Sequence, residues 1–129
     1  MHTTTSPDEH NKIILANKSD PEKWKKDPHF ITKSRVEKSN LLLSLTYSGG
    51  CKEHKFELVA WNYFVRRPNE IQADILLSHD SNSDSCKAII KEELCFDLSP
   101  MKSEYQKFFQ STTGTIVLLL QNSKIRYEF

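Results

Sequence analysis

The sequence predicts a mainly β protein, an antiparallel β-sandwich or open barrel of six or seven strands with one short α-helix near residues 100–110. Three observations predict this class. Apolar and polar residues alternate with a period of two in several segments, as in strands with one buried face. Turn-forming residues separate these segments about every 8–12 residues. Only one of the segments between predicted strands is long enough for a crossover helix, which argues against a parallel sheet.

The clearest strands are two neighbouring segments in the first half of the chain. The segment NLLLSLTYSG, residues 40–49, places every second residue from Leu41 to Tyr47 on one face. Residues 54–61 repeat this alternation, and a short turn around Gly49 and Gly50 joins the two segments. The sequence therefore predicts a β-hairpin here.

The remaining segments of the chain also alternate between strand and turn signals, with one helix signal. Ser99 and Pro100 are a typical helix start, and apolar residues follow at helical spacing. The segment TGTIVLLLQ is apolar on both faces, which indicates a strand covered on each side. The remaining expected elements are a first strand from residue 30, a loop at 63–70, a strand at 71–79, a polar loop at 80–85, a strand at 86–98 and a last strand at 123–129.

The length of 129 residues suits a single domain. Residues 1–29 are polar, contain three prolines and have no sustained periodicity, so they are predicted to form a flexible leader. Residues 30–129 then form the β-sandwich domain.

Charge and hydropathy limit the classes of function. Eighteen Lys and Arg face seventeen Asp and Glu, a balance that argues against a nucleic-acid-binding surface. No stretch approaches the roughly 20 apolar residues of a transmembrane helix, and no secretory signal is evident. The protein is therefore expected in the cytoplasm if Met1 is the native start, or outside it if the chain is a mature fragment.

Chain direction brings together the residues with the most distinctive chemistry. If successive strands run up and down, the turn after residue 47 and the loop after residue 79 lie at the same end. Cys95 is expected near the opposite end, as a free, buried thiol. Four residues fall at the shared end: Cys51, His54, His79 and Cys86.

These residues leave three specific interpretations open. Cys51 and Cys86 could form a disulfide, which requires an oxidising compartment and Cα atoms about 4.4–6.8 Å apart. All four residues could instead bind zinc, since two thiolates and two imidazoles suit a tetrahedral ion. Cys51 could also be a nucleophile with a histidine base oriented by Asp80 or Asp84, although no cysteine hydrolase signature is present.

The polar loop between the last two of these residues also resembles part of a calcium site. Asp80, Asn82 and Asp84 have the first three ligand spacings of a calcium loop, but Ser85 and Lys91 replace the required glycine and glutamate. A solvated loop is the better prediction. With Gly49 and Gly50, these three residues complete the candidate binding end.

A second cluster is aromatic. Trp61, Tyr63 and Phe64 lie beside Arg66 and Arg67 at a strand end, where they could form a binding rim. Packing against the predicted helix is the preferred interpretation.

Three segments carry a resemblance to a known group of proteins. They are YSGGCKEHKFEL, SHDSNSDSC and LCFDLSPMKSEYQ. Over residues 41–115 the chain resembles an uncharacterised bacterial family of small hypothetical proteins, often exported or of lipoprotein type. The family has no established activity. The resemblance implies an envelope location, which supports the disulfide over zinc, and would make the leader a membrane tether.

The sequence thus predicts a non-enzymatic binding or structural module of the bacterial envelope, with a Cys51–Cys86 disulfide at one end and no cofactor. The alternatives are a zinc-binding domain and a cysteine-dependent enzyme. The sequence identifies neither a partner nor an oligomeric state.

Overall fold

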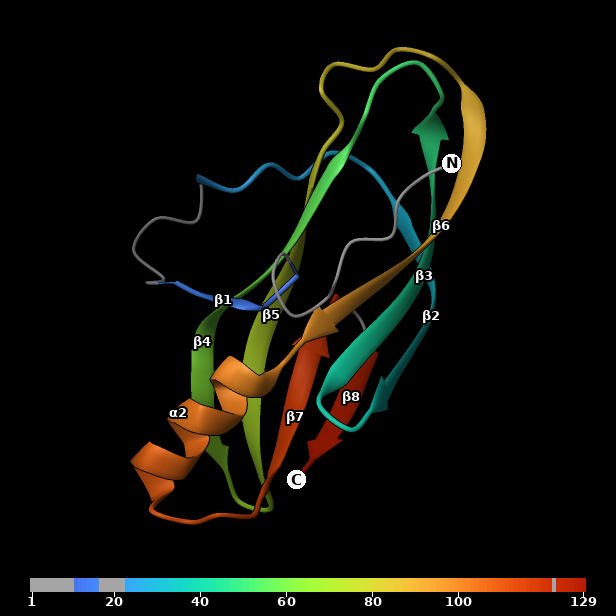
Figure 1. Cartoon of the computed structure of the whole chain (residues 1–129). Coiled ribbons are helices and arrows are strands. Elements are labelled where there is room, and N and C mark those ends of the chain that lie inside the picture. Colours follow the sequence, from blue (N-terminus) through green and yellow to red (C-terminus); the bar gives the residue numbers. More distant parts are fainter. Residues whose placement is uncertain (1–10, 17–22, 122) are drawn as a thin grey trace.

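A computed structural model describes residues 11–16, 23–121 and 123–129. Their strands form two sheets, and one helix lies at the lower end of the molecule (Figure 1). The larger sheet has the order β1-β4-β5-β7-β8 and the smaller has the order β2-β3-β6. The elements are β1 (Ile14–Leu15), β2 (Phe30–Glu37), β3 (Asn40–Gly49), β4 (Lys55–Arg67), β5 (Glu70–Asp80), β6 (Ala88–Asp97), α2 (Ser99–Phe109), β7 (Thr115–Leu120) and β8 (Ser123–Glu128).

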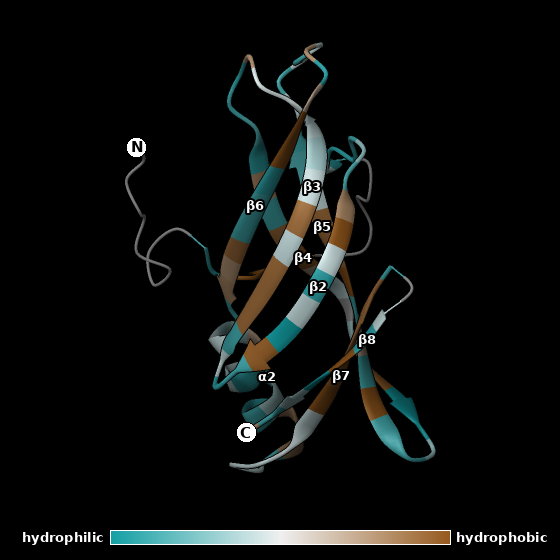
Figure 2. Ribbon diagram, turned by 90° about the vertical axis from the view of Figure 1, so that its right-hand side faces the viewer, coloured by the Kyte–Doolittle hydropathy of each residue, from teal (hydrophilic) through white to brown (hydrophobic). Residues whose placement is uncertain are grey.

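This architecture is the predicted β-sandwich with one short helix. The core lies between the sheets, where alternate residues of each strand point inward. Figure 2 shows the alternation along β2 and β3 as bands of opposite hydropathy. The buried residues of β3 are Leu41, Leu43 and Leu45, and those facing them include Leu58, Ala73, Leu77, Ile116 and Leu118.

The strand pairing corrects one prediction that bears on the site. β3 and β4 do not form a hairpin, because β3 pairs with β2 and β6 while β4 pairs with β1 and β5. The Gly49–Gly50 turn instead carries the chain from one sheet to the other. Residues 63–67, predicted as loop, belong to β4, and the tight turn lies at Pro68 and Asn69 between β4 and β5.

The described parts of the predicted leader are integrated into the fold. Ile13 is buried in the core, and its backbone N–H donates to the Asp97 carbonyl at the end of β6. β1 pairs in parallel with β4, so residues 11–16 join the two sheets. Residues 1–10 and 17–22 lie outside the described residues, and the domain boundary at residue 29 stays a prediction.

Residues 25–27 of the predicted leader pair with β5. The Lys25 carbonyl accepts the His79 N–H at 3.0 Å, and the Asp27 N–H donates to the His79 carbonyl at 3.0 Å. The Asp27 carboxylate also accepts the Ser81 N–H at 2.7 Å. These bonds place residues 25–28 beside the upper end of β5. Within the described part of the chain, none of the helices is long and apolar enough to span a bilayer.

Candidate functional site

A disulfide joins the two connections at the upper end of the molecule. Cys51 follows β3 and Cys86 precedes β6, with Cα atoms 5.9 Å apart and a sequence separation of 35. Each connection carries the chain between the sheets, from β3 to β4 and from β5 to β6 (Figure 1). The bond predicted from the sequence is therefore present, and it holds together two crossovers rather than the ends of two hairpins.

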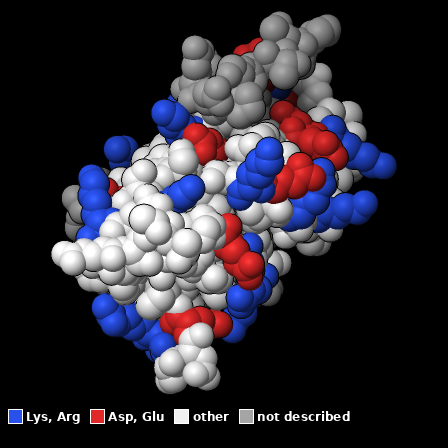
Figure 3. Space-filling model, turned by 60° about the horizontal axis from the view of Figure 1, so that its bottom comes forward, with Lys and Arg blue, Asp and Glu red and all other residues white. Residues whose placement is uncertain are grey.

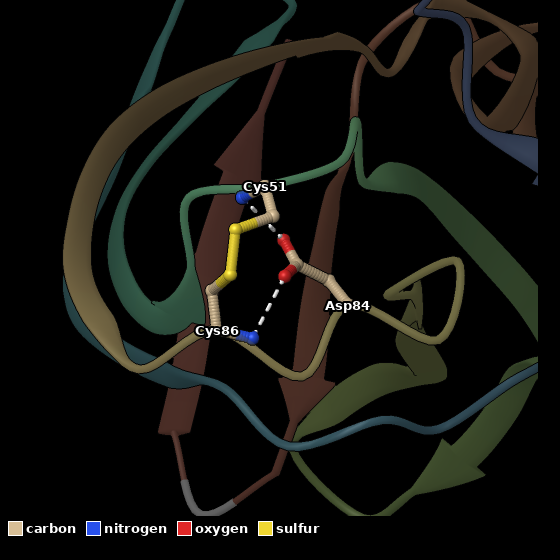
Figure 4. Close-up of side chains that lie close together, drawn as sticks. All are labelled: Cys51, Asp84 and Cys86. Atoms are coloured by element: carbon tan, nitrogen blue, oxygen red, sulfur yellow. Dashed lines mark hydrogen bonds between the residues drawn. A yellow bond between two sulfur atoms is a disulfide. The ribbon is translucent and has the colours of Figure 1, made fainter.

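Asp84 holds the backbone of both cysteines. Its Oδ2 accepts the N–H groups of Cys51 at 3.1 Å and Lys52 at 3.0 Å, and its Oδ1 accepts the N–H of Cys86 at 3.0 Å. Its side chain is 0% exposed. Figure 4 shows the carboxylate pointing toward the disulfide from the β5–β6 connection. A single buried carboxylate thus braces the same two connections that the disulfide joins.

His54 continues this network into the protein. Its Nε2 lies 2.9 Å from Asp84 Oδ2, and its Nδ1 lies 2.7 Å from His79 Nε2. The side chain is 2% exposed. Gly49 makes room for this arrangement, because a Cβ at that position would lie 2.7 Å from His54 Nε2.

His79 ends the network against the segment before β2. Its Nδ1 lies 3.0 Å from the Pro28 carbonyl oxygen and 3.2 Å from that of Asp27. The residue is 1% exposed. Its ring stacks on Phe56, with ring centroids 4.3 Å apart. The upper end therefore combines side chains from two parts of the chain with backbone carbonyl groups from a third.

The hydrogen-bond partners assign the protons of both histidines. His79 Nδ1 faces carbonyl oxygens, which accept only, so this nitrogen carries the proton. Burial lowers the pKa of His79, which keeps the ring neutral and leaves Nε2 as an acceptor. His54 then carries a proton on Nδ1, which it donates to His79, and its Nε2 lies against the Asp84 carboxylate.

The cluster stabilises the ionised form of Asp84. The bond from His54, assisted by the N–H groups of Cys86, Cys51 and Lys52, holds the pKa of the Asp84 carboxyl far below its ordinary value. Tyr47 packs its ring on His54, with centroids 4.6 Å apart, and donates its hydroxyl to Glu92. Burial and that contact raise the pKa of Tyr47. The cluster is therefore a buried, hydrogen-bonded carboxylate–imidazole pair covered by an aromatic ring.

Of the other residues of the predicted binding end, Gly50 and Asn82 are exposed and Asp80 is half-buried. Asp80 Oδ1 accepts the Asn82 N–H at 2.9 Å, which forms a local turn. A hollow of about 430 Å³ is lined by Glu53, His54, Lys55, Asp80 and Asn82. Since the His54 side chain is almost fully buried, this hollow offers mainly exposed polar groups. Asp84 belongs to the buried cluster rather than to a calcium loop with Asp80 and Asn82.

Sequence reasoning brought the four predicted residues to one end of the molecule but missed two features. It considered Asp84 as a group orienting a catalytic base, as a calcium-loop position and as part of the binding end, but not as the acceptor of both cysteine N–H groups. It also did not include the carbonyl groups of Asp27 and Pro28. A signal for Asp84 was present: an aspartate two residues before Cys86 can accept that residue's N–H in an Asx turn. The carbonyl groups had no signal, because any residue supplies one. Cys95 is a free, partly buried thiol in β6.

Phe64 of the aromatic cluster packs against the helix, as preferred from the sequence, and Tyr63 packs edge-on against Phe64. The Phe64 ring lies within 5.8 Å, between centroids, of Tyr105, Phe108 and Phe109. The Arg66 guanidinium lies 5.0 Å from the centre of the Phe109 ring. This end of the molecule combines uncharged surface with Lys and Arg interspersed among Asp and Glu (Figure 3).

Comparisons with known proteins show the class of fold. The chain is similar to a NigD-like immunity protein from Bacteroides caccae (TM-score 0.65, 17% identity) and a candidate lipoprotein from Bacteroides fragilis (TM-score 0.57, 12% identity). It is also similar to a DUF1344 protein of unknown function from Bacteroides vulgatus (TM-score 0.55, 14% identity). No protein-family model and no curated protein matches the chain.

These structures agree with the resemblance to an uncharacterised bacterial family. In each case the match covers 92% of this chain. The chain spans 63% of the immunity protein, 68% of the candidate lipoprotein and 55% of the DUF1344 protein. At these identities the likeness concerns the fold alone.

Proposed function

We propose that this protein is a non-enzymatic binding or structural module of the bacterial cell envelope. The observation that carries the proposal is the Cys51–Cys86 disulfide, which fastens both crossovers at one end of the sandwich. Disulfides of this kind persist in oxidising compartments and are rare in the cytosol. The candidate lipoprotein among the structural neighbours supports the same location.

The contacts of the cluster favour a structural role over catalysis. A cysteine nucleophile needs a free sulfur, and the Cys51 sulfur is bonded to Cys86. A general base must reach a substrate proton, yet the ring nitrogens of His54 and His79 bond to each other, to Asp84 and to backbone carbonyls. The network therefore stabilises the end of the domain and presents the surrounding polar residues as a rigid surface.

Differential thiol labelling in the native bacterium tests this proposal. Cells are treated with an alkylating reagent before lysis and fractionation, and the chain is then recovered, reduced and labelled with a second reagent. We expect the chain in the envelope fraction with Cys95 alone open to the first reagent, and Cys51 and Cys86 labelled only after reduction. A Cys51→Ser variant should expose Cys86 to the first reagent, while Cys95→Ser should leave both bonded cysteines protected.

The contradicting result is equally clear. A chain in the cytosolic fraction whose three cysteines all react with the first reagent would overturn both the location and the structural role of the disulfide.

A further inference from the structure

The two disulfide sulfurs and one carboxylate oxygen of Asp84 form a compact donor set. One oxygen of Asp84 and the Sγ atoms of Cys51 and Cys86 all lie within 4.8 Å of one another. Figure 4 shows the carboxylate directed at the sulfur pair. Two thiolates with a carboxylate are a suitable donor set for zinc, which binds sulfur and oxygen ligands at about 2.0–2.3 Å.

The hydrogen bonds identify which oxygen of Asp84 is available. A carboxylate oxygen has two lone pairs, and Oδ2 already accepts from Cys51, Lys52 and His54. Oδ1 accepts only from the Cys86 N–H among the described contacts, which leaves it one further acceptor position. Oδ1 is therefore the oxygen suited to bind a cation.

The hydrogen bonds between Asp84 and the two cysteine backbones do not depend on the disulfide. Asp84 holds the Cys51 and Cys86 backbones through their N–H groups, independently of the sulfur–sulfur bond. Reduction would leave two thiols beside an ionised carboxylate. Deprotonation of those thiols would concentrate negative charge there, and a divalent cation would neutralise it.

We propose that the reduced chain binds one zinc-type divalent cation through Cys51 Sγ, Cys86 Sγ and Asp84 Oδ1. This donor set differs from the one predicted from the sequence, because His54 and His79 already use their ring nitrogens in the buried network. The exposed position of Cys51 provides the path of entry, and water completes the coordination.

The chemical steps balance as follows. A trialkylphosphine transfers an electron pair to the disulfide, the sulfur–sulfur bond breaks, and one water molecule supplies the oxygen of the phosphine oxide and the protons of both thiols. Zinc then displaces the two thiol protons, forms two zinc–sulfur bonds and one zinc–oxygen bond, and releases the protons to solvent.

Metal titration of oxidised and reduced protein tests the proposal. The Cys95→Ser chain is reduced with the phosphine under argon and titrated with zinc against a chromophoric chelator, with cobalt as the spectroscopic probe. We expect one zinc per reduced chain, none per oxidised chain, and a cobalt spectrum with sulfur-to-metal charge-transfer and tetrahedral ligand-field bands.

Matched variants identify the ligands. Cys86→Ser should abolish the sulfur-rich cobalt spectrum, and Asp84→Asn should weaken zinc binding by at least roughly tenfold. Glu53→Gln, which removes an exposed acid from the same end, should leave binding unchanged. Circular dichroism checks that each variant folds, and the cobalt spectrum of the Cys95→Ser chain decides the case should Asp84→Asn not fold. Stoichiometric zinc on the oxidised chain, absence of binding by the reduced chain, or unchanged binding by Cys86→Ser would each overturn the proposal.

Discussion

At the scale of single residues, Gly49 and Asp84 determine the geometry of the upper end. Asp84 is the common acceptor for both cysteine backbones and for His54, and Gly49 leaves the space in which the His54–Asp84 contact forms. Buried polar groups are costly unless they are paired, and here each partner is supplied within the cluster. The described residues include no buried side-chain N or O atom without a hydrogen-bond partner.

Gly49→Ala should destabilise the protein. The added methyl carbon would lie 2.7 Å from His54 Nε2 and 3.0 Å from Asp84 Oδ2, so the buried His54–Asp84 pair must move. Overpacking of this kind costs about 1–3 kcal/mol. Chemical denaturation measures the free energy of unfolding, with Ser48→Ala, an exposed neighbour, as the control. Equal stability of the two variants would show that the pair is not held as described.

His79 should make stability depend on pH. Burial lowers its folded-state pKa below the unfolded value of about 6.5. Between these values the unfolded chain binds more protons, so the free energy of unfolding should fall as pH drops below about 6.5. His29, His54 and Asp27 are the neighbouring charged or titratable groups.

Denaturation at pH 7.5 and pH 5 measures this effect, and His79→Gln is the comparison because it cannot titrate. The variant should lose less stability than the wild type over this interval. The same loss in both proteins would place the pH dependence elsewhere.

At the scale of elements, strand existence was predictable but strand pairing was not. The alternation in residues 40–49 and 54–61 follows from one buried face on each strand, and both strands are present. The same alternation does not state whether neighbouring strands share a sheet, so the Gly49–Gly50 turn was misassigned as a hairpin. Residues 11–16 have too short a pattern to show a strand, yet the edges of β4 and β6 supply partners for their backbone groups.

Ile13→Ala should show that this segment belongs to the domain. Ile13 is 3% exposed and packs in the core, so its truncation should lower the free energy of unfolding by roughly 2–4 kcal/mol. Lys12→Ala, next to it and exposed, is the matched control and should change stability little. A change below about 0.5 kcal/mol for Ile13→Ala would agree with a free leader instead.

At the scale of the whole molecule, the fold class followed from the sequence because alternation, turn spacing and a single helix signal agree. The convergence of the cysteines and histidines followed from the reversal of strand direction alone. The His54–Asp84 contact, the role of Asp84 and the carbonyl partners of His79 required coordinates, since they depend on contacts between segments far apart in the sequence.

The central claim is that the Cys51–Cys86 bond fastens two crossovers and thereby holds the end of the sandwich. The most direct test is the free energy of unfolding of oxidised and phosphine-reduced protein in the Cys95→Ser background, measured by denaturant titration with a chelator present. Closure of a loop with a separation of 35 residues predicts that reduction lowers this free energy by roughly 3–4 kcal/mol. Equal values for the oxidised and reduced protein would contradict the claim.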